Sequence, residues 1–207
     1  MATTMGKTEL IDRIVRLEWD DFSHVNNNDA TVTCQSRPDT FTRMRRALLE
    51  TWGEELLASY LQDVSEAREA GRSLMSEKYA WMMETTDPAG FAEVAALLPD
   101  VPAESRGRIE RIAKISLVWQ AQANALLPRL TAGGRALIAE DDRTDATSFE
   151  TYLRGELMTY SARTLAIYER DVLACWRAGR NLAIANLDNI ARSYGYRDAA
   201  DAERRSG

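Results

Sequence analysis

The segment Ala70-Gly71-Arg72-Ser73-Leu74 recurs 108 residues later as Ala178-Gly179-Arg180-Asn181-Leu182. Upstream, at the same offset, identical residues stand at Phe41 and Phe149, Arg46 and Arg154, Leu49 and Leu157, Thr51 and Thr159, Leu57 and Leu165, Ala58 and Ala166, Tyr60 and Tyr168, Asp63 and Asp171, and Val64 and Val172. This period is far too long for a solenoid, whose units span about 20–50 residues. We therefore expect a duplicated unit whose two copies pack into one body.

The apolar residues follow helical spacing almost everywhere along the chain. This pattern predicts an all-α fold: a pseudo-two-fold bundle of about seven helices formed by internal duplication. We expect a single domain over residues 1–207, with one repeat at about 7–86, the second at about 102–195, and a frayed tail at 196–207. The longest expected helices run over 38–71 and 149–179, each ending at a glycine suited to a left-handed cap.

Two polar segments occupy equivalent places in the expected repeats, residues 24–37 and 128–146. The second contains Gly133-Gly134 and a charged run, and it is long for a connection in a compact domain. It is either a lid over a ligand or a surface connection. The sequence Thr147-Ser148-Phe149-Glu150 after it has the pattern of a capping box, which predicts a helix start.

The composition excludes several classes of partner and site. With a net charge of −6 and no block of Lys and Arg, the chain is not expected to bind nucleic acid or a membrane. The single histidine, His24, excludes histidine-rich metal sites, and we expect no metal and no cofactor. Two distant cysteines, without an apolar stretch near the start, favour reduced thiols and a cytoplasmic location.

Several phrases of the sequence resemble a bacterial family of unknown function, the one numbered four-one-two-five. They are Leu17-Glu18-Trp19, Cys34-Gln35, Met44-Arg45, the segments 52–57 and 59–61, Gly71-Arg72, the segment 77–80, and Met82-Met83. The most specific match is Thr147 to Leu157, followed by Thr159-Tyr160-Ser161. The chain departs at Leu48, where the family pattern would place Gln. The resemblance spans nearly the whole chain and implies its fold and marked segments, but no activity.

Four charged residues fall on helix faces that should be buried. Glu156 lies on the stripe of Phe149 and Leu153, and Glu18 lies between Ile14 and Phe22. On the expected helix 38–71, the apolar face also takes in Arg45 and Glu55. A lone buried charge costs several kcal/mol, so these groups must pair with one another, with a ligand or with water. They form either a structural network, for example Arg45 with Glu18, or a ligand or catalytic site.

The functional interpretation assigns the remaining polar residues of this region. Burial should raise the pKa of Glu156, and Tyr160 with Glu18 would share its acid–base chemistry. The expected substrate-binding residues are Arg45, Trp52, Glu55, Tyr152, Arg154, Cys34 and Gln35. Arg154 has a simpler interpretation as a surface ion pair with Glu150, four residues earlier. Asp63 and Asp171 should each cap their own Gly-Arg break.

The sequence therefore favours a cytoplasmic, metal-independent enzyme with its site between the two repeats. Acid–base chemistry of the lyase, isomerase or transferase type would act on a small polar or anionic metabolite, including amino-acid derivatives. The alternative is a non-catalytic helical module that binds a small molecule or a partner protein. A polar cavity at the charged cluster would favour the enzyme, and a dry interior with an apolar groove would favour the module.

Overall fold

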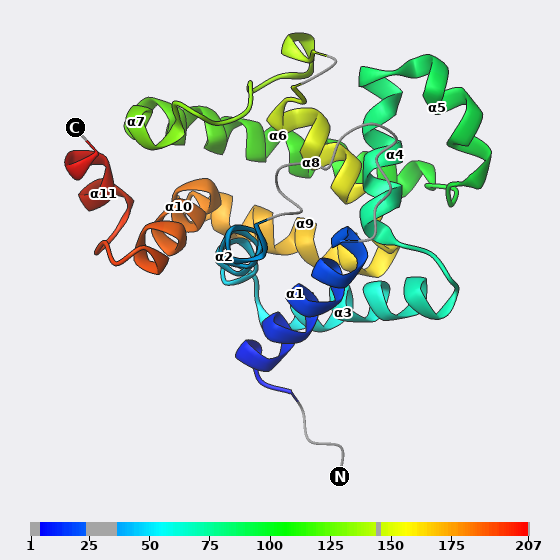
Figure 1. Ribbon diagram of the computed structural model, residues 1–207, viewed down its shortest axis with the longest axis horizontal. Coiled ribbons are helices and arrows are strands. Elements are labelled where there is room, and N and C mark those ends of the chain that lie inside the picture. Colours follow the sequence, from blue (N-terminus) through cyan, green and yellow to red (C-terminus); the bar gives the residue numbers. More distant parts are fainter. Residues whose placement is uncertain (1–4, 24–36, 144–145, 207) are drawn as a thin grey trace.

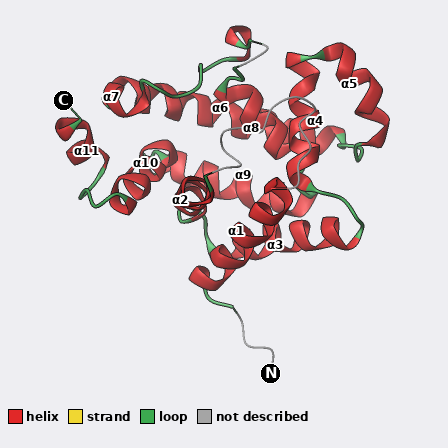
Figure 2. Ribbon diagram, viewed as in Figure 1, coloured by secondary structure: helices red, strands yellow, loops and turns green. Residues whose placement is uncertain are grey.

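The chain is all-helical in a computed structural model that describes residues 5–23, 37–143 and 146–206 (Figures 1 and 2). Within these ranges the helices are α1 (Lys7–Ser23), α2 (Pro38–Leu49), α3 (Glu54–Glu69), α4 (Leu74–Thr86), α5 (Pro88–Val94), α6 (Ala103–Leu126), α7 (Pro128–Thr131), α8 (Phe149–Leu157), α9 (Ala162–Arg177), α10 (Leu182–Ser193) and α11 (Ala199–Arg205). Two 3-10 turns, η1 (Ala95–Leu97) and η2 (Ala139–Asp141), complete them. Eleven α-helices in the described residues correct the expected seven.

The two longest expected helices are each broken near the middle. The break at Thr51-Trp52-Gly53 separates α2 from α3, and the break at Thr159-Tyr160-Ser161 separates α8 from α9. Gly53 and Ser161 then take extended backbone angles as N-caps of the following helices. Gly and Ser are favoured at this position, and Ser161 accepts a hydrogen bond from the amide of Thr164. A continuous apolar pattern concealed these caps.

The corresponding helices of the expected repeats have bounds 108 residues apart. Helix α3 spans 54–69 and α9 spans 162–177, while α4 begins at 74 and α10 at 182. The two glycines that precede α4 and α10 are left-handed, with φ of 70° at Gly71 and 66° at Gly179, as the sequence predicted. Residues 41–74 and 149–182 therefore share the same order of helix, break, helix, glycine turn and helix.

Helix packing follows the same correspondence. Helix α1 packs on α2, α3 and α4, and α6 packs on α8, α9 and α10. Helix α4 of the first half packs on α8 of the second, while α10 of the second packs on α2 of the first. Helices α3 and α9 contact each other near the centre of the molecule (Figure 1). The halves thus exchange their fourth helices, and the main apolar core runs through both.

The contact between α4 and α8 depends on a glycine. A Cβ atom at Gly155 would lie 2.7 Å from Met82 Cγ and 2.9 Å from the carbonyl oxygen of Lys78. No side chain fits there without displacement, so glycine is required for the two backbones to approach. This approach brings α4 beside Glu156, the next residue along α8.

The segments outside the paired helices are more ordered than the sequence suggested. The expected tail contains α11, whose Glu203 carboxylate accepts the backbone amides of Arg129 and Leu130 at the start of α7. In the described part of 128–146, the carbonyl oxygen of Ala136 accepts the amide of Phe149. The cap of α8 is Ser148, one residue beyond Thr147, and Glu150 instead accepts from Arg154 and from the amide of Ala139.

Among the described helices, none combines the length and the apolar character needed to cross a membrane.

Candidate functional site

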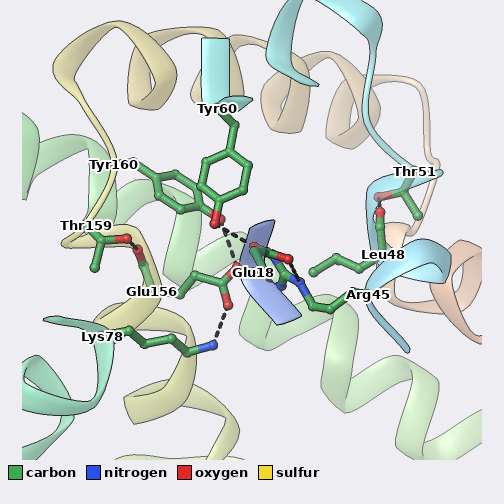
Figure 3. A network of polar contacts seen from close by, with 9 residues as sticks. All are labelled: Glu18, Arg45, Leu48, Thr51, Tyr60, Lys78, Glu156, Thr159 and Tyr160. Atoms are coloured by element: carbon green, nitrogen blue, oxygen red, sulfur yellow. Dashed lines mark hydrogen bonds and ion pairs between the residues drawn. The ribbon is translucent and has the colours of Figure 1, made fainter. Parts of the chain in front are cut away.

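Four buried charged residues meet between α1, α2, α4 and α8 and form what we call the charged network (Figure 3). Arg45 donates from Nε and Nη2 to both oxygens of Glu18, at 2.8 and 2.5 Å. Its Nη1 donates to Glu156 Oε1 at 2.9 Å. Lys78 Nζ donates to Glu156 Oε2 at 2.7 Å. The predicted cluster of Glu18, Arg45 and Glu156 is thus brought together, and Lys78 completes it.

Two tyrosines complete the charged network. The hydroxyl of Tyr60 donates to Glu18 Oε1 at 2.7 Å, and that of Tyr160 donates to Glu156 Oε1 at 2.9 Å. Their rings lie against each other with centroids 4.9 Å apart, and Figure 3 shows both hydroxyls directed at the carboxylates. Within the described chain, two cations therefore balance two carboxylates, and each carboxylate also accepts from a phenol.

The electrostatics of Glu156 differ from the sequence expectation. Burial alone would raise its pKa, but the charges of Arg45 and Lys78 and the hydrogen bonds they donate outweigh burial. The pKa of Glu156 therefore lies well below its ordinary value, and the predicted rise is wrong. The carboxylate is 6% exposed and ionised at neutral pH. The prediction failed because it omitted Lys78, a second cation in direct contact with the carboxylate.

The other titratable groups of the network are held in their usual protonation states. Burial, reinforced by the neighbouring carboxylates, raises the pKa of Tyr60 and of Tyr160 well above the ordinary value, so both remain hydrogen-bond donors. Burial opposes the charge of Lys78, but Glu156 outweighs it, and the pKa of Lys78 is raised. No member with a shifted pKa is poised to exchange a proton near neutrality.

The interior of the charged network is filled. The space between Glu18, Arg45, Tyr60, Lys78 and Glu156 amounts to about 10 Å³. This volume is at the lower limit for a single water molecule. The network therefore leaves no room for a substrate among its own side chains.

A larger cavity of about 250 Å³ lies on the other side of Glu156, between α2, α6, α8, α9 and α10. We call it the aromatic cavity, because six of its lining residues are aromatic: Trp52, Trp119, Phe149, Tyr152, Tyr160 and Tyr168. Glu156 contributes to its wall, as do Leu48, Leu153 and Asn186. Of the predicted site residues, Trp52, Tyr152, Glu156 and Tyr160 line this one space.

Tyr152 links the charged network to the aromatic cavity. Lys78 Nζ lies 3.3 Å from the centroid of the Tyr152 ring, and the guanidinium of Arg135 lies 4.6 Å from it. Arg135 is exposed, lines the cavity and donates to the carbonyl oxygen of Thr147 at 2.8 Å. One residue of the segment 128–146 therefore reaches the cavity edge.

Other predicted site residues lie elsewhere. Glu55 is on the surface, where its carboxylate pairs with Arg170 at 2.8 Å and its side chain is 58% exposed. The break before α3 turns Glu55 away from the face that a continuous helix would have given it, so its predicted burial is wrong. Arg154 pairs with Glu150, as its simpler interpretation predicted, and with Glu110. Cys34 and Gln35 lie outside the described residues.

Asp63 does not cap its own Gly-Arg break. Its carboxylate accepts the backbone amide of Ser161, at the start of α9 in the other half, at 3.0 Å. In the opposite direction, a Cβ built on Gly53, the cap of α3, would lie 3.8 Å from Asp171 Oδ2. The equivalent positions of the two acids reflect contacts between the halves, and not contacts within each.

Two network residues, Lys78 and Tyr60, were missed by the sequence interpretation. Lys78 is 3% exposed and stands on α4 four residues after Leu74 and four before Met82, both buried. Tyr60 lies on α3 between Leu56 and Val64, again on the buried face. Applying the test for charged residues on apolar stripes to α4 would have identified Lys78.

Among the described residues, the acidic and sulfur-containing side chains form no group of three or more that could hold a metal ion. Cys175, the cysteine that the structure describes, is a buried free thiol on α9.

The fold and its interior define an all-helical protein with a buried ion-pair network beside an aromatic cavity. The chain belongs to the family described as proteins of unknown function, DUF4125, whose sequence profile matches residues 8–204. The predicted family is therefore confirmed. No curated protein and no solved structure matches the chain.

Proposed function

We propose that this protein binds a small molecule in the aromatic cavity, and that the charged network is the structural support of one cavity wall. The observation that carries the proposal is a difference between equivalent places in the two halves. At an offset of 108 residues, Arg45, Lys78 and Glu156 correspond to Leu153, Asn186 and Leu48. The first three fill their space, and the second three line a cavity of about 250 Å³.

The comparison rests on a second proposal, that the halves arose by duplication and pack about a pseudo-two-fold axis. The exchange of α4 and α10 between the halves supports it. So do the aromatic rings at the centre, where Trp52 corresponds to Tyr160 and Tyr60 to Tyr168. The ring centroids are 5.3 Å apart for Trp52 and Tyr168, and 4.9 Å apart for Tyr160 and Tyr60.

Matching hydrogen bonds at the helix ends also support this symmetry. The hydroxyl of Thr51 donates to the carbonyl oxygen of Leu48 at 2.6 Å, and that of Thr159 donates to the carbonyl oxygen of Glu156 at 2.8 Å (Figure 3). The backbones at Leu48 and Glu156 thus have the same local structure, and the side chains alone differ.

The aromatic cavity has the character of a ligand site. Protein pockets for small molecules are lined mainly by apolar and aromatic side chains, with a few polar groups that orient the ligand. A closely packed interior seldom leaves a space of this size. By scaling from a cavity of roughly 150 Å³ that binds benzene, the aromatic cavity would hold about ten non-hydrogen atoms.

An acid–base enzyme is the second candidate, because Glu156, Tyr152 and Tyr160 line the same cavity as a bound molecule would. The pKa shifts make it the weaker one: the carboxylate is kept ionised and the Tyr160 phenol is kept protonated. A cytoplasmic location also belongs to the proposal, and the free thiol of Cys175 supports it because reduced thiols are typical of that compartment.

A matched pair of substitutions tests the binding proposal. Ala183 lines the aromatic cavity, whereas Ala92 is exposed on α5 and lines none of the cavities described above. Ala183→Phe should fill the cavity, and Ala92→Phe adds the same ring to the surface. In a screen of aromatic fragments by ligand-observed NMR, we expect fragments that bind wild type and Ala92→Phe but lose at least tenfold in affinity with Ala183→Phe. Equal binding to all three proteins, or no binding to any, would contradict the proposal.

A further inference from the structure

Two buried polar atoms belong to side chains in the wall of the aromatic cavity and lack a partner among the described residues. They are Trp52 Nε1, a hydrogen-bond donor, and Asn186 Oδ1, an acceptor. Trp52 is only 3% exposed, so water does not replace the missing partner. Buried polar groups are nearly always paired in native proteins, because leaving one unpaired costs free energy. Unpaired groups of both kinds in the wall of one cavity point to a missing molecule that supplies both partners.

The charges around the cavity specify a neutral molecule. Glu156, the carboxylate in the wall, already accepts from Arg45, Lys78 and Tyr160. It therefore has no need of a cation from a ligand. Arg135 stands at the edge, exposed to water and bonded to the carbonyl oxygen of Thr147. A charged ligand inside would lose its hydration without gaining an unpaired counter-charge, which is unfavourable.

The shape of the wall specifies a flat molecule. The aromatic side chains come from the break before α3, from α6, α8 and α9, and from the break before α9. Aromatic rings bind other flat groups by stacking or by edge contacts. The volume limits that group to about ten non-hydrogen atoms.

We infer that the ligand is a small, neutral, planar molecule of the carboxamide type, with a C=O group that accepts from Trp52 and an N–H group that donates to Asn186. A ring amide, a lactam or an aryl carboxamide has this chemistry, since it carries one acceptor and one donor on a flat frame. Small shifts of the two side chains would open these atoms to the ligand. The inference rests on the proposed function and names its ligand class.

Three probes of one shape and different charge test this inference: benzamide, benzoate and benzylamine. The affinity of each is measured by ligand-observed NMR titration against the full-length protein. Benzamide should bind at least tenfold more tightly than either charged probe. Tighter binding of benzoate or benzylamine, or no binding of benzamide, would overturn the ligand class. The fragment screen with Ala183→Phe decides the proposed function separately, because it does not depend on charge or on the amide.

Matched tryptophan variants test the role of the unpaired donor. Trp52→Phe keeps an aromatic ring and removes the N–H group, so benzamide should lose at least tenfold in affinity. Trp81→Phe is the control: Trp81 Nε1 is also buried without a partner in the described chain, but it lines a separate cavity beside Arg154. Asn186→Leu provides an independent variant that removes the acceptor. Equal loss in Trp52→Phe and Trp81→Phe, or no loss in Trp52→Phe and Asn186→Leu, would contradict the inference.

Discussion

The charged network and the aromatic cavity occupy corresponding places in the two halves, yet their interiors are filled differently. Around Glu156, long charged side chains interlock and leave about 10 Å³. Around Leu48, shorter side chains leave about 250 Å³. The surrounding helices are nearly the same in order and bounds. The comparison teaches that one helical framework serves both to stabilise an interior and to open it, depending on three side chains.

The two regions also differ in how they respond to change. A buried ion pair gains little over an apolar pair, but removing one partner leaves an uncompensated charge in the interior. The network is therefore a set of residues that must be retained together. The cavity side is built from residues that each contribute separately. Three predictions test this difference, from the largest expected effect to the smallest.

Removing the charge of Glu156 should have the largest effect. Glu156→Gln keeps the shape but leaves Arg45 and Lys78 without their shared carboxylate, which we expect to cost about 3–5 kcal/mol of unfolding free energy. The melting temperature should fall by roughly 6–20 °C for a chain of this size. Urea denaturation and calorimetry measure the two quantities.

Glu55→Gln is the control for this prediction. It makes the same chemical change in an ion pair with Arg170 whose members are both more than half exposed. We expect a loss of about 0–1 kcal/mol there. If Glu156→Gln were as mild as Glu55→Gln, the network would not be a structural support, and a role of Glu156 toward a ligand would gain weight.

The stability of the network should depend on acid pH in one direction. The pKa of Glu156 is lower in the folded state than in the unfolded chain, where it is about 4.3. Its stabilising contribution is therefore complete above that value and is lost as the pH falls toward the folded pKa. The stability difference between wild type and Glu156→Gln should be constant from pH 6 to 8 and should shrink below about pH 4, by up to about 1.4 kcal/mol per pH unit. A difference that grows at acid pH would exclude this linkage.

Gly155→Ala should have a smaller effect, through packing. The added methyl would meet Met82 and the carbonyl oxygen of Lys78, so α4 must move away from α8. We expect a loss of about 1–3 kcal/mol, the usual range for overpacking a core. Gly133→Ala serves as the control, because a Cβ there meets no atom of the described chain within 4 Å. Equal melting temperatures for the two variants would mean that the α4–α8 contact tolerates displacement.

Much of the helical framework was predictable from local sequence. The left-handed turns at Gly71 and Gly179 follow from the glycines themselves, which adopt positive φ without steric cost. The burial of Glu18, Arg45 and Glu156 followed from helical spacing, because each lies among apolar neighbours on its own helix. These features depend on residues a few positions apart, so the sequence contains them directly.

The partners of those residues were decided by tertiary structure. Lys78 reaches Glu156 because α4 of one half packs on α8 of the other, across 78 positions of sequence. Glu55 faces solvent because the chain breaks at Gly53, which changes the helical phase after it. The low pKa of Glu156 and the cavity beside it both depend on these distant contacts. Local periodicity determines which face of a helix is buried, but the packing of helices from two halves determines which charges meet there and where space remains.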